Sequence, residues 1–437
     1  MRASPKMPTN RVEREVGLQR VVMTYIVTGL AFMLLPGTIL GVWNLISISS
    51  REKLQGLSPA WLQAHGHAQI YGWIGTFVLG IGFYSLSKMG DLPSFAVRRA
   101  WIAYGLWTVG VLLRWGANVT GWQWRTALPV SALLELGGFA IFFATVSRHK
   151  PDSGAARKPK EPWMLVVVAS TCGFLLALLL NLYTTAQTAL SASSPAISSF
   201  LDQRLLAVPV WAFLVPTVWG FNARWLPAFL GLRAPNGRQL LMALGLAWIG
   251  VVMAVAGHSM LSAILLLPAV ALASLALHIF QRPEKRAKTT GVHASFPWFV
   301  RIAYVWLSIA ACLTVWAAYA DRAGGIGGAS RHAVTVGFLA AMVFTIGQRI
   351  LPAFCGARVL FSKRMMLASL LLLNAGCALR VISEIQAYEG LGLAQLSWHV
   401  LPVSAVTELV AVTVFAANLF ATFCRPPAHL KNAQVLA

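Results

Sequence analysis

Two histidines, His67 and His332, occur in similar surroundings although 265 residues separate them. Each is followed by alanine and, five residues after the histidine, by a glycine, Gly72 or Gly337. Both lie at the start of a long apolar run. A neutral imidazole in an apolar environment is costly unless it is paired or bound. We therefore expect each ring to have a partner or a ligand.

The regions that follow these histidines share an arginine and a glutamate, in the same order. Gly110-Val-Leu-Leu-Arg114 corresponds to Gly376-Cys-Ala-Leu-Arg380. Pro129-Val-Ser-Ala-Leu-Leu-Glu135 corresponds to Pro402-Val-Ser-Ala-Val-Thr-Glu408. Three matches in one order, each with a polar residue, predict an internal repeat.

A weaker third copy lies between these two. Arg224-Trp-Leu-Pro-Ala-Phe229 is similar to Arg349-Ile-Leu-Pro-Ala-Phe354. We expect this copy to have Ala207 in place of the histidine and Ser274 in place of the glutamate. The third copy therefore retains the repeated sequence pattern but lacks the histidine and glutamate that are candidate ligands.

The elements that position these residues are predicted to be membrane-spanning helices. The chain has 437 residues, 57% hydrophobic and 11% charged, with a mean hydropathy of +0.68. A helix needs about 20 apolar residues to cross a bilayer. The sequence offers twelve such runs, near 21–46, 62–87, 98–117, 126–147, 163–187, 203–223, 239–257, 259–280, 298–320, 331–354, 364–386 and 398–424.

These runs predict an all-α polytopic membrane protein. One membrane domain, 21–424, follows a basic N-terminal segment, 1–20, and precedes a tail, 425–437. The repeat divides the twelve helices into three similar four-helix units, with the repeated sequences on helices 2–4, 6–8 and 10–12. Repeats that run in the same direction predict units related by an axis along the membrane normal.

The net charge of +22 is concentrated in the N-terminal segment, in the loops after helices 4 and 8, and in the tail. By the positive-inside rule, this distribution predicts that both termini are cytoplasmic. The charge is thereby accounted for by topology and by attraction to anionic lipids of the bilayer. We expect no nucleic-acid partner.

With this topology, His67 and His332 lie near the outer face in equivalent positions, from which they can face a shared space. Two axial histidines of a haem iron fit that symmetry, and Gly72 and Gly337 would give a flat ring room. The residues are equally compatible with a satisfied polar contact and with proton or ion transport.

Arg114 and Arg380 are also equivalent, and buried arginines need anions. Haem propionates would serve. The alternative is an ion pair with Glu135, Glu384 or Glu408. Glu135 and Glu408 lie two to three turns inside their helices, where such carboxylates could also carry protons.

His65 precedes His67 by two residues, so a regular helix turns the two side chains roughly 200° apart. They cannot face the same site. His65 with His258 or His399 could hold a metal such as copper. The five cysteines show no CxxCH spacing, which argues against covalently attached haem and leaves haem b as the expected form.

Together, His65-Gly-His67, Gly72-Trp73, Arg224-Trp-Leu-Pro-Ala-Phe229 and His332-Ala-Val-Thr-Val-Gly337 resemble the NnrS family of twelve-helix membrane proteins. The resemblance implies haem and copper, a bacterial inner membrane, and a role in nitric oxide metabolism, denitrification or nitrosative-stress tolerance, with nitric oxide as a ligand.

The three groups of helices also look, more distantly, like the catalytic subunit of haem–copper oxidases and nitric oxide reductases. In that family the equivalents of His67 and His332 hold a low-spin haem. Helix 6 has no histidine and helix 7 only His258, so the three-histidine copper site of a terminal oxidase is missing.

The sequence is also compatible with functions of another class. Parallel repeats with Arg114, Arg380, Glu135 and Glu408 along a pathway would suit a secondary transporter, and Pro209 and Pro216 could interrupt helix 6. An electron-transfer subunit with a quinol or cytochrome donor is a further alternative. Whether the protein is itself a haem-dependent oxidoreductase stays open.

Overall fold

The computed structural model describes residues 9–53, 57–88, 97–147, 161–356 and 358–425. Residues 1–8 of the predicted N-terminal segment, residues 426–437 of the tail, the basic loop 148–160 and residues 89–96 lie outside these ranges. The rest of the N-terminal segment, from Thr9, is part of a helix. Every regular element in the described ranges is a helix. The prediction of an all-α protein is confirmed.

The first four-helix unit begins with one continuous helix made of α1 (Thr9–Phe32), η1 (Met33–Ile39) and α2 (Leu40–Ser49), where η marks a π-helical stretch. The second helix consists of α3 (Pro59–His67), η2 (Ala68–Gly75) and α4 (Thr76–Lys88). The third and fourth are α5 (Val97–Thr120) and α6 (Trp124–Ser147).

The second and third units have the same order of helices. The second consists of α7 (Pro162–Ser191), then α8 (Ser199–Leu205) with η3 (Val208–Leu214) and α9 (Val215–Leu230), then α10 (Gly237–Val255) and α11 (Ser259–Ala276). The third consists of α12 (Phe296–Ala320), then α13 (Gly325–His332) with η4 (Ala333–Ala340) and α14 (Ala341–Phe354), then α15 (Lys363–Tyr388) and α16 (Ala394–Cys424).

Ten of these helical segments in the described part of the chain are long and apolar enough to cross a membrane. The helices 59–88 and 97–120 coincide with the other two predicted spans. Large apolar side chains such as Leu112, Ile249 and Leu371 are more than half exposed, as expected where lipid replaces water. The prediction of a polytopic membrane protein is confirmed.

The three units are built alike. In each unit the first helix packs on the π-helical stretch of the second: α1 on η2, α7 on η3 and α12 on η4. The third and fourth helices form the pairs α5 with α6, α10 with α11 and α15 with α16. The last helix, α16, packs against α2 and η1 and joins the third unit to the first.

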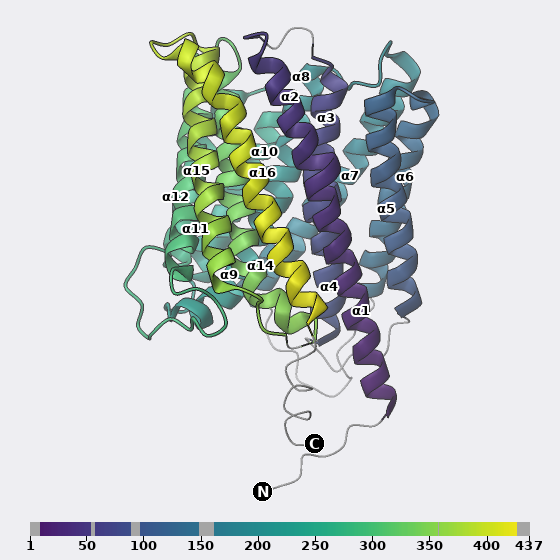
Figure 1. The fold of residues 1–437 in the computed structure, drawn as a ribbon, viewed down its shortest axis with the longest axis vertical. Helices are drawn as coiled ribbons and strands as arrows, with labels where there is room; N and C mark the ends of the chain where they lie inside the picture. Colours follow the sequence, from purple (N-terminus) through teal and green to yellow (C-terminus); the bar gives the residue numbers. More distant parts are fainter. Residues whose placement is uncertain (1–8, 54–56, 89–96, 148–160, 357, 426–437) are drawn as a thin grey trace, which may run out of the picture.

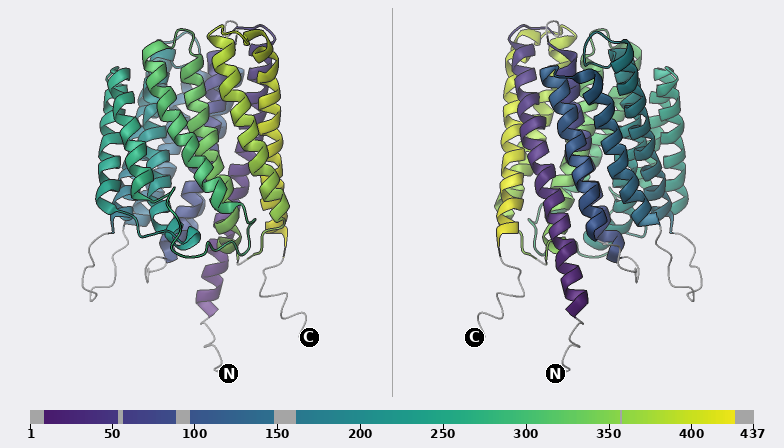
Figure 2. Two further views of the ribbon diagram at one scale, coloured as in Figure 1. Left: turned by 90° about the vertical axis from the view of Figure 1, so that its left-hand side faces the viewer. Right: turned by 90° about the vertical axis from the view of Figure 1, so that its right-hand side faces the viewer.

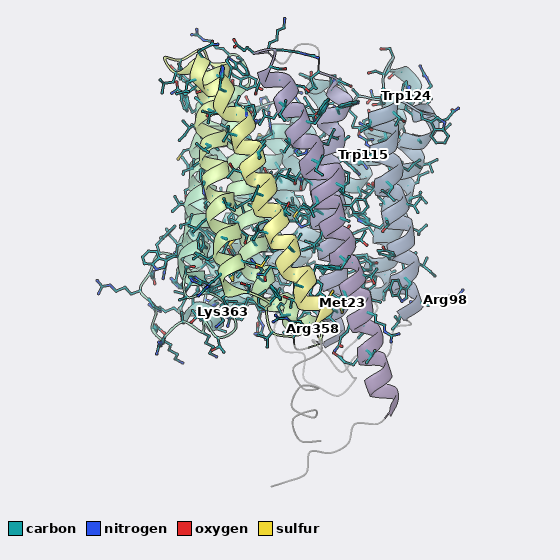
Figure 3. All side chains as sticks on the ribbon, in the orientation of Figure 1. Met23, Arg98, Trp115, Trp124, Arg358 and Lys363 are labelled. Atoms are coloured by element: carbon teal, nitrogen blue, oxygen red, sulfur yellow. The ribbon has the colours of Figure 1, made fainter. Side chains whose placement is uncertain are left out.

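The helices run between two faces of one bundle (Figure 1). We call the face at which α1 begins and α16 ends the terminal side, and the other the opposite side; both can be followed in the side views (Figure 2). Side chains line the bundle throughout, with Arg98, Arg358 and Lys363 at the terminal side and Trp124 at the opposite side (Figure 3).

Candidate functional site

A π-helical stretch begins directly after each of the three equivalent positions His67, Ala207 and His332. η2 follows His67, η3 follows Ala207 and η4 follows His332. A π-helical turn inserts an extra residue into an α-helix and is common at functional sites. The local backbone thus repeats in all three units, including the one without histidine.

His67 is engaged within the first unit. Its Nε2 lies 2.7 Å from Oε1 of Glu135 on α6, and Glu135 is fully buried. The other carboxylate oxygen of Glu135 accepts a hydrogen bond from Asn181 Nδ2 on α7, at 3.2 Å. The His67 ring also stacks on Tyr71, with the ring centroids 4.5 Å apart. His67 and Glu135 therefore form a closed, buried pair.

Arg114 on α5 lies beside this pair, and its side chain is buried. Its Nε and Nη1 have no hydrogen-bond partner among the described residues. Glu135 and Asp202, from the start of α8, interact with it electrostatically. Two carboxylates therefore lie within electrostatic range of Arg114, but neither is within ion-pair distance of its guanidinium in the described part of the chain.

Asp202 was not singled out from the sequence. It also interacts electrostatically with Arg331 of α13, so this residue of the second unit is within electrostatic range of arginines from the first and third units. The chain has only 13 acidic residues, and an aspartate at the start of a predicted span is a signal that could have identified it.

His65 faces a different neighbour from His67, as the helical geometry predicts. Its Nδ1 lies 2.9 Å from the carbonyl oxygen of Gly37 in η1. Its ring packs over Gly41, where a Cβ atom would meet Cε1 at 2.6 Å. With Nδ1–H donating to Gly37, the Nε2 lone pair remains available to a ligand, which is the usual arrangement of a metal-binding histidine.

The structure brings His332 into the same region as His65. His332 interacts electrostatically with His65 and Arg380, and His65 with Arg380. Among the described contacts, none joins His67 to His332. His65 is therefore the histidine found within electrostatic range of His332.

His332 has a basic neighbour, Arg380, and an acidic neighbour, Glu384. Arg380 Nε donates to Oε2 of Glu384 at 3.0 Å, and the same oxygen lies 3.7 Å from His332 Nδ1. Nη1 of Arg380 is buried with no partner among the described residues. Arg331 also interacts with Glu384 electrostatically. Arg380 thus has an ion pair and one donor left over.

Glu408 occupies the position equivalent to Glu135 but has a different environment. A Cβ atom on Gly110 would lie 2.8 Å from Glu135 Cγ, and one on Gly376 2.6 Å from Glu408 Cγ. Oε1 of Glu408 is buried without a hydrogen-bond partner in the described chain. The pair formed by His67 and Glu135 has no counterpart at Glu408.

The middle unit corrects one sequence assignment. A Cβ atom on Gly250 would meet Leu266 and the Ser262 carbonyl, as Gly110 meets Glu135 and the Ser131 carbonyl. Leu266, and not Ser274, is therefore equivalent to the glutamates. By the same register the equivalent of Arg114 is Ala254. The middle unit has replaced all three polar residues by apolar ones.

The space expected beside Gly72 and Gly337 is already filled. A Cβ atom on Gly72 would lie 3.1 Å from Phe32 and from Val111, and one on Gly337 2.5 Å from Trp306. These glycines allow neighbouring helices to approach, so the expectation that they make room for a flat ring is wrong.

Two of the predicted copper ligands lie at the protein surface. His258 precedes α11, and His399 lies on α16 with its Nδ1 3.0 Å from the Gln395 carbonyl; both are exposed. No group of three histidine, cysteine, aspartate or glutamate side chains suited to a metal ion occurs among the described residues.

Residues 201–422 match a family described only as a domain of unknown function (DUF8744). The chain belongs to this family. No curated protein matches the chain. A solved structure of a haem–copper terminal oxidase dimer, determined by cryo-EM, has a similar fold, with a TM-score of 0.63 and 13% sequence identity. The match covers 94% of this chain and 85% of the oxidase chain. At this identity the likeness establishes a haem–copper oxidase-like fold.

The ionisable residues discussed above form two groups in this DUF8744 protein. The first contains His67, Glu135, Asn181, Arg114 and Asp202. The second contains His65, His332, Arg380 and Glu384. The first group can hold a proton between an imidazole and a carboxylate. The second offers two imidazoles with a cation beside them.

Proposed function

We propose that the protein is a haem-binding integral membrane protein that acts in nitric oxide metabolism or nitrosative-stress tolerance, as the resemblance to the NnrS family implies. The observation that carries the haem proposal is that His65 and His332 lie within electrostatic range of each other and of Arg380, in a chain with a haem–copper oxidase-like fold. The haem would be of the b type, since the cysteines lack the spacing for covalent attachment.

The surroundings of the two histidines suit a haem. The Gly37 carbonyl orients His65 with Nε2 free, and Nη1 of Arg380 is a buried donor that lacks a partner among the described residues. A guanidinium with a spare donor suits a carboxylate such as a propionate. In this proposal His65 and His332 hold the iron and Arg380 binds a propionate.

A bound haem iron supplies one-electron redox chemistry and can bind diatomic gases. The protein's own residues set the environment. The ion pair with Glu384 fixes the Arg380 side chain, and the Gly37 carbonyl fixes the tautomer of His65. The electron donor would be a quinol or a cytochrome. Copper remains a prediction that metal analysis tests.

We also propose a bacterial inner-membrane location with both termini in the cytoplasm. The support is the arginines and lysines at the terminal side, which include Arg98, Arg358 and Lys363 (Figure 3). Under the positive-inside rule, this side faces the cytoplasm. The two histidine groups would then lie in the outer half of the membrane.

The direct test is a pyridine haemochrome assay and an optical spectrum of the protein purified from haem-sufficient cells. We expect about one haem b per chain, with a Soret band that shifts when nitric oxide is added to the reduced protein. A preparation that is folded and monodisperse but contains no haem would overturn the proposal. If the haem spectrum does not change when nitric oxide is added, the proposed function is restricted to electron transfer.

A proton-coupled transporter is the second candidate, and the His67–Glu135 pair favours it because buried ionisable pairs often carry protons in membrane proteins. The broken helix expected at Pro209 and Pro216 is absent, because α8, η3 and α9 form one span, 199–230. Proton movement with a solute in haem-free proteoliposomes would support this candidate. Glu135→Gln should then abolish that movement.

A further inference from the structure

An apolar cavity lies between the second helices of the three units and is lined by no residue of either histidine group. Its volume is about 120 Å³. The lining residues come from the second helix of each unit: from η2 and α4, from η3 and α9, and from η4 and α14. These residues follow the histidine positions along helices that run toward the terminal side, so the cavity lies deeper in the membrane.

The cavity repeats in the sequence as the helices do. Measured from His67, Ala207 and His332, the residues seven, ten, eleven and fourteen positions later line it in every unit. Two of these four sets are Ile74, Leu214 and Leu339, and Val78, Val218 and Val343. A cavity lined by equivalent residues of three related helices lies on the pseudo-threefold axis that relates them. It is therefore a feature of the repeat.

The lining offers little to water. It is aliphatic and aromatic except for Thr217 and Asn222. Thr217 Oγ1 donates to the Phe213 carbonyl at 2.7 Å, and Asn222 Nδ2 donates to the Tyr304 hydroxyl at 2.8 Å. A buried water needs two to four polar partners, whereas an apolar cavity of about 150 Å³ in another protein stays dry and binds benzene or xenon.

We propose that this axial cavity binds one small, uncharged, apolar molecule of the size of a dissolved gas. The site does not depend on haem, because none of the haem-ligand candidates lines it. Its occupant would enter from the hydrocarbon core of the bilayer, where apolar gases dissolve better than in water. Ile346 and Gly347 of α14 both line the cavity.

Gly347 provides the test. A Cβ atom on Gly347 would have only Val343 and Leu351 within 4 Å, and both of these residues line the cavity. The side chain of a Gly347→Leu variant would therefore enter the cavity. Gly245→Leu on α10 is the matched control, because Gly245 is exposed and a Cβ atom there would contact nothing within 4 Å.

The experiment is xenon binding to the full-length protein in detergent, followed by ¹²⁹Xe NMR and by anomalous diffraction from xenon-pressurised crystals. We expect one xenon atom in the wild type and in Gly245→Leu, and none in Gly347→Leu. If Gly347→Leu does not fold, Val218→Phe fills the cavity from α9 and should have the same effect. Ordered water in the cavity, or xenon occupancy that the filling variants leave unchanged, would overturn the proposal. The result should be the same for haem-free and haem-loaded protein.

Discussion

Nε2 of His67 lies 2.7 Å from Oε1 of Glu135, and both side chains are buried between helices of the first unit. Glu408 holds the equivalent position in the third unit, and its Oε1 has no partner in the described chain. The two equivalent glutamates therefore differ in what they stabilise, and their substitution should have different consequences.

Glu135→Leu is expected to destabilise the protein by about 3 kcal/mol, because it leaves the buried His67 without its carboxylate partner and removes one of the two carboxylates near the buried Arg114. Glu408→Leu is expected to be neutral or stabilising by up to about 1 kcal/mol, because it removes a carboxylate oxygen that lacks a hydrogen bond. Leu266 shows that leucine fits this position in the fold. Thermal unfolding in detergent measures both. Equal losses in the two variants would refute the distinction.

The close approach of α5 to α6 predicts that alanine substitutions at two glycines of α5 will have opposite effects on stability. A Cβ atom on Gly110 would lie 2.9 Å from the Ser131 carbonyl oxygen, whereas on Gly105 it would contact nothing within 4 Å. Gly110→Ala should therefore cost about 1–3 kcal/mol through overpacking. Gly105→Ala should gain up to about 1 kcal/mol from helix propensity. The difference in melting temperature between the two variants is the readout, and a stabilising Gly110→Ala would contradict the helix spacing.

The buried ion pair of α15 should be strongly coupled. Arg380 Nε and Glu384 Oε2 are 3.0 Å apart with both side chains largely buried, whereas Arg233 and Glu284 are 3.6 Å apart and well exposed. Double-mutant cycles with alanine should give about 1–3 kcal/mol for the first pair and less than about 1 kcal/mol for the second. Equal coupling energies would argue that the Arg380–Glu384 pair is solvated.

The repeat predicts that the missing pair can be introduced into the second unit. Ala207 and Leu266 are the counterparts of His67 and Glu135. Leu266→Glu alone should destabilise, because it buries an unpaired carboxylate. Adding Ala207→His should restore at least about 1 kcal/mol through a new contact. A double-mutant cycle by chemical denaturation measures this coupling, and an additive double variant would count against the structural equivalence of the units.

Much of the fold was predictable because it follows from regular chemistry. Apolar runs of membrane length specify the spans, and matched glycine, arginine and glutamate spacings specify the repeat. The separation of His65 from His67 also follows from helical geometry alone, and it is confirmed by their different partners, Gly37 and Glu135. These features depend on distances along a single helix.

The contacts between helices were less predictable. The partners of the histidines depend on how each helix is rotated, and the π-helical stretches directly after His67 and His332 change that rotation without an obvious sequence signal. The register of the middle unit also differs from the prediction, because both α10 and α11 are shorter than α5 and α6. The packing of Gly250 identifies Leu266 as the equivalent of Glu135. Asp202 contributes across unit boundaries, which comparison of the units cannot reveal.

The central claim is that His65 and His332, and not His67, hold a haem. The most direct measurement is the optical spectrum and haem content of His65→Ala, His332→Ala and His67→Ala, each purified from haem-sufficient cells and checked for folding. We predict that His65→Ala and His332→Ala lose the low-spin haem spectrum while His67→Ala keeps it. Loss of the spectrum in His67→Ala with retention in His65→Ala would contradict this assignment.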